Sequence, residues 1–371
     1  MKKIKVVEFF GEPLNYGGQE AFILNVYSKI DKSKFDFSFI TPFDCQNKLL
    51  KKTINDNNDE LIFDNKEFNS KMRKKFIIET AKKYLNDKYD VIHIHSGSVF
   101  TLYNVAKIAK KKGIKKVIVH SHASGVSTLK YKLIKLVSDL NITKYVDYYM
   151  ACSRDAGIWK FPKKVIDSDK FFVIKNGIDI KKFEYNKKNR DEYRKEYDLE
   201  KKNIICTIGR FAEEKNPLYT LRVFKEYLKL DENGYLLMIG GSGDQEKDVE
   251  SFINDNKLEK NVLILKNRDD INCFLSMSDI YIMPSLWEGL GMAAIEAQTS
   301  GMNVLCSDNI PEDVNISSLF HRLSLSEGEE NWAKEIKKLI NSKRENVSKS
   351  IIESGFDVSD SSKKVEDIYL K

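Results

Sequence analysis

The sequence lacks any long apolar run. None approaches the roughly 18 residues that a helix needs to cross a membrane, so we expect no membrane-spanning segment. Residues 1–5 lead straight into a short apolar stretch, without the small-residue cleavage site that ends a secretory leader. We therefore expect a cytoplasmic protein.

Cysteine is scarce and scattered. The five cysteines are Cys45, Cys152, Cys206, Cys273 and Cys306. Their number is odd and no C-x-x-C spacing occurs, which predicts neither a disulfide framework nor a zinc ribbon. The G-x-G-x-x-G fingerprint is also missing, so a dinucleotide is not indicated. No recognised nucleic-acid-binding motif occurs either, and we expect no nucleic-acid partner.

The chain has material for two hydrophobic cores. It contains 371 residues, of which 42% are apolar and 32% charged, as in a soluble globular protein. This length exceeds what one core usually supports, so two domains are expected.

The net charge of +7 is unevenly distributed. Residues 1–160 carry 29 Lys and Arg against 17 Asp and Glu, whereas the remainder carries 33 against 38. Lysines cluster at residues 71–75, 82–83 and 110–116, and the first two clusters are interleaved with apolar residues. Such a mixture suits an anionic membrane surface, at about 1 kcal/mol per basic residue near the lipid. It equally suits solvated helix faces, so a peripheral position on the inner face of the cell membrane stays open.

Strand-like and helix-like segments alternate along the chain, which predicts parallel sheets with helices on their faces. The first series begins with the strand at residues 4–10. The second begins at residues 203–208 and ends with a final strand at residues 302–306. A polar stretch at 163–170 and the turn signal Asn176-Gly177 separate the two series.

We predict an α/β fold of two doubly wound, Rossmann-like domains that face each other across a cleft. The first domain would comprise residues 1–170 and be joined by a C-terminal helix at 355–371. The second would comprise residues 171–354. Ligands of such sheets collect at the carboxyl ends of the strands.

The first strand leads to the pair Gly17-Gly18 and a helix expected at residues 19–29. A strand, a glycine turn and a helix let the backbone approach a phosphate closely at the helix start. A plain tight turn explains the glycine pair equally well.

Four histidines form two H-x-H pairs at expected strand ends, His93 with His95 and His120 with His122. Alternate residues of a strand point to one face, so each pair could converge on an ion. No carboxylate or cysteine stands beside them in the sequence, and a hydrogen-bonded polar cap is the commoner role. We therefore expect no metal, and we expect His120 or His122 to face the ligand as a hydrogen-bond donor.

Arg210 and Lys215 stand in the loop after the strand at 203–208, at the end where ligands bind. Two fixed cations there can neutralise the charge that builds on a departing diphosphate. Taken alone, the same two residues are ordinary surface side chains.

Residues 284–297 follow an apolar strand and pass through a glycine-rich turn into a helix that opens at Gly291. Glu288 precedes the helix, where unpaired N–H groups and the helix dipole favour anionic ligand groups. Glu296 lies at most ~12 Å further along the axis. This spacing matches the reach of a nucleotide sugar, although a helix start with two solvated carboxylates is the simpler interpretation.

Together these motifs resemble those of the family 4 retaining glycosyltransferases of GT-B fold. The matching motifs are Gly17-Gly18, Asn176-Gly177-Ile178-Asp179, Gly209-Arg210 through Lys215-Asn216-Pro217, Gly240 to Gly243, and Glu288 to Glu296. The resemblance covers residues 6–307. The segment 120–122 and the C-terminal tail are similar to the branch that builds capsules and exopolysaccharides.

The resemblance implies roles for these residues. Arg210 and Lys215 would hold the donor diphosphate, and backbone N–H groups near Gly18 would complete this cradle. Glu288, with the nearby N–H groups of Leu290 and Gly291, would face the transferred sugar. Glu296 would accept hydrogen bonds from the ribose, and His122 would contact the sugar ring. The expected catalytic residues are His122, Arg210, Lys215 and Glu288. The expected substrate-binding residues are Gly17, Gly18, His120, Asn176, Gly243, Lys266, Leu290, Gly291 and Glu296.

The family also implies retention of anomeric configuration, with no metal and no cofactor. Two departures from its pattern are visible. Gly301-Met302-Asn303 replaces the usual Gly-x-Pro, and the glycine loop ends in Ser242-Gly243-Asp244 without the usual proline. Both departures concern the rigidity of loops rather than the charged roles.

The implied function is transfer of a hexosyl unit from a nucleotide sugar, UDP-linked, to a lipid-linked or cell-surface glycan acceptor in polysaccharide biosynthesis. One alternative is a glycosyltransferase-like subunit that binds a partner or glycan without catalysis. The other is a nucleotide-sugar epimerase of the same fold. The presence of both cations and both carboxylates argues against the first alternative.

Overall fold

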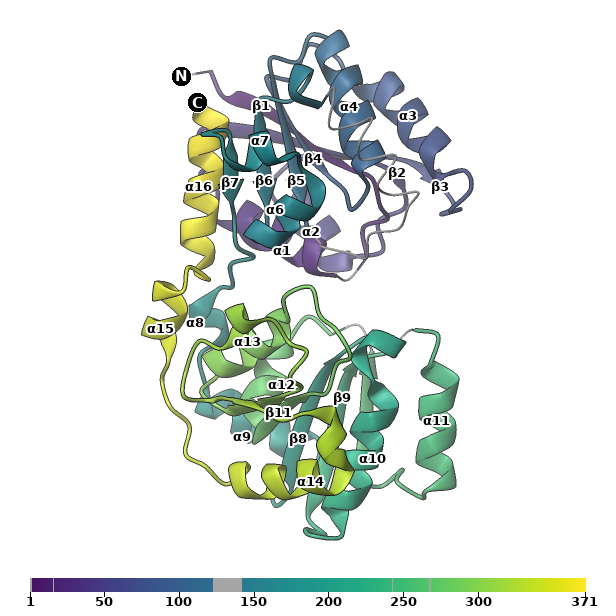
Figure 1. Cartoon of the computed structure of the whole chain (residues 1–371), viewed down its shortest axis with the longest axis vertical. Helices are drawn as coiled ribbons and strands as arrows, with labels where there is room; N and C mark the ends of the chain where they lie inside the picture. The colour runs from purple at the N-terminus through teal and green to yellow at the C-terminus, as the bar shows by residue number, and fades with distance from the viewer. Residues whose placement is uncertain (1, 16, 123–141, 242, 267) are drawn as a thin grey trace. The chain divides into compact units, whose positions relative to one another are not determined.

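The computed structural model describes residues 2–15, 17–122, 142–241, 243–266 and 268–371. It divides the chain into two compact units, Met1–Gly177 with Val358–Lys371, and Ile178–Asp357. The chain thus leaves the first unit after Gly177, whereas the sequence placed this boundary after residue 170. It returns with a C-terminal helix that begins at Val358 (Figure 1).

Within the described residues, the first unit contains a seven-stranded parallel sheet in the order β3-β2-β1-β4-β5-β6-β7. The strands are β1 (Ile4–Phe10), β2 (Phe35–Phe43), β3 (Glu60–Lys66), β4 (Val91–His95), β5 (Lys116–Ser121), β6 (Tyr148–Ala151) and β7 (Phe171–Val173). β4 is buried throughout and β1 from Val6 onward, because helices cover both faces of the sheet.

The helices of the first unit pack on the two faces of its sheet. They are α1 (Gly18–Lys29), α2 (Lys48–Asp56), α3 (Arg73–Tyr84), α4 (Val99–Lys111), the 3-10 helix η1 (Ile142–Lys144), α6 (Arg154–Lys160), α7 (Lys163–Ile166) and α16 (Val358–Leu370). Phe22 of α1 and Val365 of α16 share one core, whereas Ile77 of α3 and Leu102 of α4 belong to another. The C-terminal helix is therefore an integral part of the first unit.

In the described part of the second unit, six parallel strands form a sheet in the order β10-β9-β8-β11-β12-β13. The strands are β8 (Asn203–Gly209), β9 (Gly234–Gly240), β10 (Val262–Lys266), β11 (Ile280–Met283), β12 (Asn303–Cys306) and β13 (Phe320–Arg322). The expectation that the strand near residue 306 is the last was wrong. β13 has only three residues and gains its strand conformation by pairing with β12, which its own sequence does not signal.

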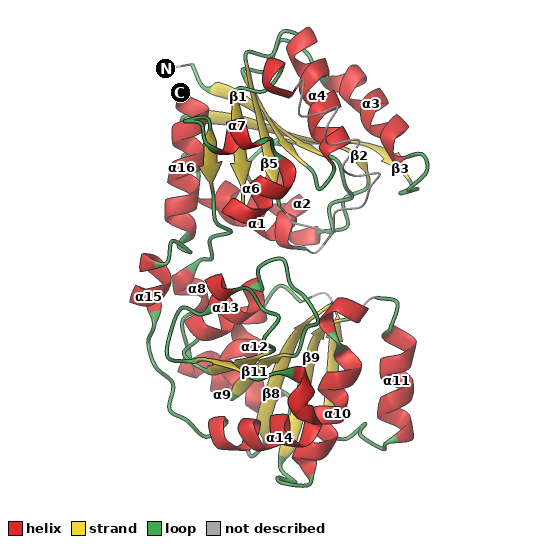
Figure 2. Ribbon diagram, viewed as in Figure 1, coloured by secondary structure: helices red, strands yellow, loops and turns green. Residues whose placement is uncertain are grey.

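In the second unit, helices alternate with the strands of the sheet; they are coloured red in Figure 2. They are α8 (Ile180–Phe183), α9 (Lys187–Glu196), η2 (Glu213–Lys215), α10 (Pro217–Leu228), α11 (Glu246–Asp255), α12 (Ile271–Met277), α13 (Met292–Thr299), η3 (Glu312–Val314), η4 (Leu325–Glu327), α14 (Gly328–Leu339) and α15 (Ser348–Glu353). Among the helices that the structure describes, none is long and apolar enough to cross a membrane.

The segment Asn176-Gly177 was expected to turn, but the structure contains no turn at these two residues. Two hydrogen bonds to α1 explain the difference. The Asn176 Nδ2 donates to the Gly18 carbonyl at 3.5 Å, and the Gly177 carbonyl accepts from Asn25 Nδ2 at 3.0 Å. These contacts draw the segment along α1, which overrides the local turn preference of Asn-Gly.

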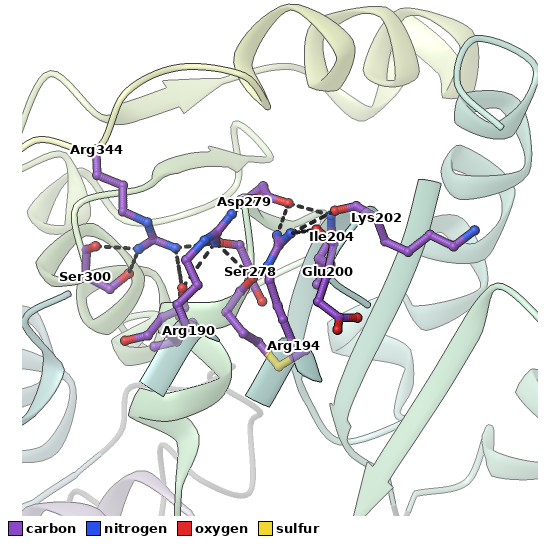
Figure 3. Close-up of polar contacts among 12 residues, drawn as sticks. Arg190, Arg194, Glu200, Lys202, Ile204, Ser278, Asp279, Ser300 and Arg344 are labelled. Carbon is purple, nitrogen blue, oxygen red and sulfur yellow. Dashed lines mark hydrogen bonds and ion pairs between the residues drawn. The ribbon is translucent and has the colours of Figure 1, made fainter. Parts of the chain in front are cut away.

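A group of three arginines, shown in Figure 3, fixes the turn between α12 and β11. Arg190 and Arg194 of α9 hold the two oxygens of Asp279 at 2.6 and 2.5 Å. Arg190 and Arg344 also donate to carbonyl groups at the C-terminal end of α12, including Ser276. Guanidinium groups satisfy these carbonyls, which lack partners within the helix. The start of β11 is thereby held firmly, and the loop after this strand carries Glu288.

Candidate active site

In the second unit, two glycine loops approach each other at the carboxyl ends of β8 and β9. Gly240 has a φ of +132°, and a Cβ at this position would lie 2.2 Å from the Gly209 carbonyl oxygen. A Cβ on Gly243 would lie 2.1 Å from the carbonyl oxygen of Phe211. Only glycine allows these contacts. The expected binding residue Gly243 therefore supports the loop that carries Arg210. Ser242, within the same motif, lies outside the described residues.

Lys215 and Glu288, two expected catalytic residues, are in direct contact. The Lys215 ammonium group lies 2.6 Å from each carboxylate oxygen of Glu288. The Ser285 hydroxyl donates to the same carboxylate at 2.8 Å. The Glu288 side chain is 7% exposed, so three hydrogen bonds hold it in one position. A carboxylate and a cation are thus fixed side by side where β8 and β11 end.

Arg210 follows β8 directly and is the more accessible cation, with 64% of its side chain exposed. It contacts Glu214 at 2.5 Å. Arg210, Lys215, Gly209 and Ser285 line one pocket at the carboxyl end of the sheet. The structure therefore brings together the two cations that the sequence selected.

The start of α10 joins this pocket to the end of β11. Asn216 is the residue before the helix and Pro217 the first helical residue. However, Asn216 has a φ of +52° and its side chain makes no capping hydrogen bond. Its Nδ2 instead donates to the Pro284 carbonyl at 3.1 Å. This bond ties the Lys215 loop to the Glu288 loop.

The helix α13 begins after Gly291, as predicted. Gly291 precedes it with a φ of +90°, a backbone conformation that favours glycine. Among the hydrogen bonds of the described residues, none is donated by the N–H groups of Leu290 or Gly291. These two donors and the positive end of the helix dipole suit an anionic or hydroxyl-bearing ligand.

Glu296 lies in the middle of α13 and is half-buried. Burial raises the pKa of its carboxyl group to about 7, an effect that Lys182 of α8 opposes. This carboxyl group titrates near neutral pH, and its ionised form can accept hydrogen bonds from a ligand.

Lys266 ends β10 and ion-pairs with Glu246 of α11. Its aliphatic carbons lie beside Gly241, because a Cβ there would meet Lys266 Cγ at 3.0 Å. The residue therefore packs against the glycine loop, and its charged end is turned to α11.

In the first unit, the expected site residues gather around the start of α1. Gly17 precedes this helix and Gly18 is its first residue, with Asn176 at hydrogen-bond distance. Phe22 of α1 contacts the rings of His120 and His122, with centroids 4.8 and 5.2 Å away. The structure thus groups Gly18, Asn176, His120 and His122 on one side of the sheet.

All four histidines of the two H-x-H pairs are in one buried network. The imidazole of His95 lies 2.8 Å from His122 through Nδ1 and 2.6 Å from Glu8 through Nε2. The Nε2 of His93 lies 3.2 Å from His120 Nδ1. The sequence indicated no carboxylate beside these histidines, and the structure corrects this, because β1 pairs with β4 and sets Glu8 opposite His93.

Nitrogen atoms of His93, His95 and His120 lie within 4.8 Å of one another, a spacing that a metal ion could use. However, His93 and His95 hydrogen-bond through both ring nitrogens, and His120 through its Nδ1. A metal would have to replace several of these bonds. The donor set therefore fits a hydrogen-bonded cluster better than an ion site.

Two residues of this network were not found from the sequence. Glu8 stands among apolar residues in the buried part of β1, and Tyr369 near the end of the C-terminal helix donates its hydroxyl hydrogen to Glu8 at 2.7 Å. A charged residue within a buried strand was the one available signal for Glu8. The sequence holds no signal for Tyr369, since its contact with Glu8 spans 361 positions in the chain.

Two family models match the chain. The model described as Glycosyltransferase Family 4 matches residues 16–182, and the one described as Glycosyl transferases group 1 matches residues 189–357.

Several curated relatives are bacterial glycosyltransferases. EpsF of Bacillus subtilis, which carries a glycosyltransferase designation, is 27% identical over 93% of this chain and 91% of its own length. An Escherichia coli UDP-Gal:alpha-D-GlcNAc-diphosphoundecaprenol alpha-1,3-galactosyltransferase is 30% identical over 63% of this chain and 62% of its own. The capsular polysaccharide biosynthesis glycosyltransferase CapH of Staphylococcus aureus is 26% identical over 80% of both chains.

Solved structures share the fold. HepE of Anabaena in complex with UDP superimposes with a TM-score of 0.73 at 15% identity, over 99% of each chain. Sucrose-phosphate synthase of Thermosynechococcus elongatus has a TM-score of 0.69 at 14% identity, over 99% of this chain and 98% of its own. At these identities the likeness establishes the architecture of two parallel-sheet α/β domains.

Proposed function

The chain belongs to the family 4 glycosyltransferases, as its motifs predicted, and from this premise we propose that it transfers a hexosyl unit from a UDP-sugar to a lipid-linked or cell-surface glycan. Its fold is the GT-B fold of HepE and sucrose-phosphate synthase. Its relatives include glycosyltransferases of capsule biosynthesis and an enzyme acting on a diphosphoundecaprenol-linked sugar. The observation that carries the proposal is the contact of Lys215 with Glu288, together with the pocket that Lys215 shares with Arg210.

In this proposal Arg210 and Lys215 hold the diphosphate of the donor. Each cation at about 4 Å contributes ~4 kcal/mol at an effective dielectric near 20, before the cost of desolvation is subtracted. Arg210 is exposed and suits a bidentate contact with phosphate oxygens, and Lys215 supplies a fixed point charge. These two charges supply the stabilisation of the leaving diphosphate that a metal ion supplies in other enzymes. We therefore propose a reaction without a metal or other cofactor.

Glu288 and Glu296 would bind the two sugars of the donor. Glu288 lies ahead of α13, beside the unpaired Leu290 and Gly291 N–H groups, and would face the transferred sugar. Glu296 would accept hydrogen bonds from the ribose hydroxyls. We further propose that the anomeric configuration is retained and that the leaving phosphate oxygen takes the proton of the acceptor hydroxyl. Product stereochemistry, read by NMR on the isolated glycoside, tests retention.

Calorimetry with UDP tests the diphosphate site. We expect Arg210→Ala and Lys215→Ala each to weaken UDP binding by about tenfold or more, because each removes a charge-assisted contact. Arg222→Ala is the matched control, since Arg222 is an exposed arginine of α10 whose partner is Glu329. UDP affinity equal to that of the unchanged protein in both site variants would show that the cradle is wrongly assigned.

A panel of UDP-sugars without acceptor separates the remaining alternatives. Formation of an epimer would support an isomerase, and failure to bind any nucleotide would support a non-catalytic subunit. Slow release of UDP and free sugar, accelerated by a glycan acceptor, is the outcome that the proposal requires.

We also propose a peripheral position of the first unit on anionic membranes. Phe68 and Met72 are 52% and 37% exposed and lie beside the exposed residues Lys71, Lys74 and Lys75. Apolar side chains among cations suit a lipid headgroup region. Salt-sensitive binding to vesicles containing phosphatidylglycerol, reduced by Lys71→Glu with Lys75→Glu, is the expected result. No binding to such vesicles at low salt would refute it.

A further inference from the structure

We propose that Glu8 and His95 are positioning residues that fix the proton of His122 on Nε2, so that His122 presents a bare Nδ1 to the sugar substrate as a hydrogen-bond acceptor. The assignment of protons follows from the network itself. Its catalytic consequence rests on the proposed function.

The chain of hydrogen bonds begins at Glu8. This residue is buried in β1, where burial disfavours its ionised form. The charge of His93 and hydrogen bonds from His93 and His95 outweigh burial and hold the pKa of Glu8 well below its usual range. Glu8 is therefore a carboxylate, and a carboxylate can only accept hydrogen bonds.

The next group is His95, which is fully buried in β4. Burial, together with the nearby His93, lowers the pKa of His95 to about 4, although Glu8 opposes this. His95 is therefore neutral near pH 7 and carries one ring proton. Its Nε2 lies 2.6 Å from the Glu8 carboxylate and must donate, so its Nδ1 is the bare nitrogen.

The third group is His122, directly after β5. Its Nε2 lies 2.8 Å from the bare Nδ1 of His95, so it must donate its own proton there. Burial, with the neighbouring His95 and His93, lowers the pKa of His122 well below its ordinary value; Glu8 raises it and Lys160 of α6 lowers it. A neutral His122 with its proton on Nε2 has a bare Nδ1. This Nδ1 is buried and has no hydrogen-bond partner among the residues that the structure describes.

The C-terminal helix binds the other oxygen of the Glu8 carboxylate. The Tyr369 hydroxyl lies 2.7 Å from Glu8 Oε1 and 2.7 Å from His93 Nδ1. Because Glu8 only accepts, Tyr369 donates to it and accepts from His93. Helix α16, the last element of the chain, therefore helps to hold the first member of the network in place.

This arrangement assigns His122 a different role from the donor role that the sequence suggested. A neutral imidazole with a strongly lowered pKa is a poor proton acceptor, but its bare nitrogen accepts a hydrogen bond from a sugar hydroxyl. The buried Nδ1 loses a partner when that hydroxyl is missing from the sugar. The site would therefore discriminate against sugars that lack the hydroxyl, as buried polar groups do when they are left unpaired.

Nitrogen NMR of the full chain with 15N-labelled histidine tests the assignment directly. The chain has five histidines, so single His→Gln substitutions assign the signals. We expect His122 to be neutral between about pH 5.5 and 8, with its proton on Nε2. A proton on Nδ1 of His122 in the unsubstituted protein, or titration of His122 there near its ordinary pKa of about 6.5, would overturn the proposal.

The Glu8→Gln variant tests the origin of this protonation. A Gln amide both donates and accepts, so it no longer forces His95 to donate, and we expect mixed tautomers at His95 and His122. Asp64→Asn is the matched control, because Asp64 is another little-exposed carboxylate of the first unit that binds Thr80 and Lys83. The control should leave both tautomers unchanged. An unchanged His122 tautomer in Glu8→Gln would contradict the proposal.

Kinetics separate this proposal from the proposed function. We expect Glu8→Gln to lower kcat by about tenfold, the loss of one well-placed hydrogen bond, while UDP affinity stays the same because UDP would bind to the second unit. Tyr369→Phe should have a smaller effect in the same direction. Absence of UDP binding in the unchanged protein refutes the proposed function and leaves the NMR test valid. Normal UDP binding with an unaltered kcat in Glu8→Gln refutes the positioning role alone.

Discussion

At the scale of single residues, Glu296 is the group of the proposed donor site whose charge changes near neutral pH. Its carboxyl pKa of about 7 results from burial, with Lys182 in partial opposition. Two ribose hydroxyls donate hydrogen bonds best to an ionised carboxylate. Binding of the donor therefore favours the deprotonated form, and affinity must increase as the pH rises through this pKa.

We accordingly predict that UDP-glucose binds more tightly at pH 8 than at pH 6, by about tenfold. UDP-glucose is the suitable probe because both of its phosphates are diesters and do not titrate in this range. Titration calorimetry across this pH range measures the effect. The variant Glu296→Gln should bind weakly and with little pH dependence. If the variant kept the same pH dependence, Glu296 would not be the titrating group.

Glu288 is the second residue for which the geometry gives a specific prediction. Both of its oxygens contact the Lys215 ammonium at 2.6 Å, so a diphosphate must share this cation with a carboxylate. The variant Glu288→Gln removes the competing charge. We expect UDP to bind several-fold more tightly to this variant, while sugar transfer falls by about 100-fold because the group facing the sugar is lost.

Calorimetry measures the expected gain in UDP affinity, and a transfer assay measures the expected loss of sugar transfer. Glu226→Gln on α10 is a suitable control, because Glu226 forms a surface ion pair with Lys229. Weaker UDP binding in Glu288→Gln would mean that Glu288 contributes to the nucleotide site instead of competing with it.

At the scale of elements, the glycine loops determine how closely the ends of β8 and β9 approach. A side chain at Gly240 would meet the Gly209 carbonyl and require an unfavourable φ of +132°. We predict that Gly240→Ala destabilises the second unit by about 3 kcal/mol. The control is Gly289→Ala, since a Cβ there would have no neighbour within 4 Å. Thermal unfolding measures both, and equal melting temperatures would show that the loops can move apart.

The arginine group of Figure 3 belongs to this scale too, because it orients elements rather than ligands. Arg190 and Arg194 come from α9, Arg344 follows α14, and all of them act on the turn between α12 and β11. The loop after β11 then brings Ser285 to the pocket, and the Ser285 hydroxyl donates to Glu288. Residues with no ligand contact thus decide where the site residues lie.

At the scale of the whole molecule, acid should act on the first unit chiefly through its buried histidines. The folded pKa values of His95, His120 and His122 are lowered, mainly by burial. Below about pH 6.5 their unfolded forms bind protons that the folded unit excludes, so the first unit loses stability as the pH falls. In the second unit the folded pKa of Glu296 is raised, so its ionisation costs stability that acid restores, whereas the lowered folded pKa of His321 acts in the opposite direction.

Hydrogen exchange resolved by peptide can follow each unit separately at pH 7 and pH 5. We predict that β1, β4 and β5 lose protection at pH 5, at about 1.4 kcal/mol per pH unit for each neutral buried histidine. Below about pH 4.5 the depressed pKa of Glu8 adds to the loss. Substituting Asn for His321, in the second unit, should leave the loss in the first unit unchanged. Uniform loss across both units would refute the assignment to these histidines.

The sequence by itself determined the architecture, and it selected the two cations that the structure brings into one pocket. Alternating apolar strands and helices require parallel sheets because each element must bury its apolar face. Arg210, Lys215, Glu288 and Gly291 lie within short motifs whose local geometry, a strand end or a helix start, is set by neighbouring residues. Such information is local, and it can be read from spacing.

The tertiary structure alone decided which distant groups meet. β1 pairs with β4, and α16 returns to the first unit, so Glu8 and Tyr369 join the histidines. The strand β13 forms by pairing with β12, and Asn176-Gly177 is held against α1 instead of turning. These outcomes depend on pairing between segments far apart in the chain, which no local propensity encodes. The protonation of His122 follows from the same pairing, since burial and hydrogen-bond partners set it.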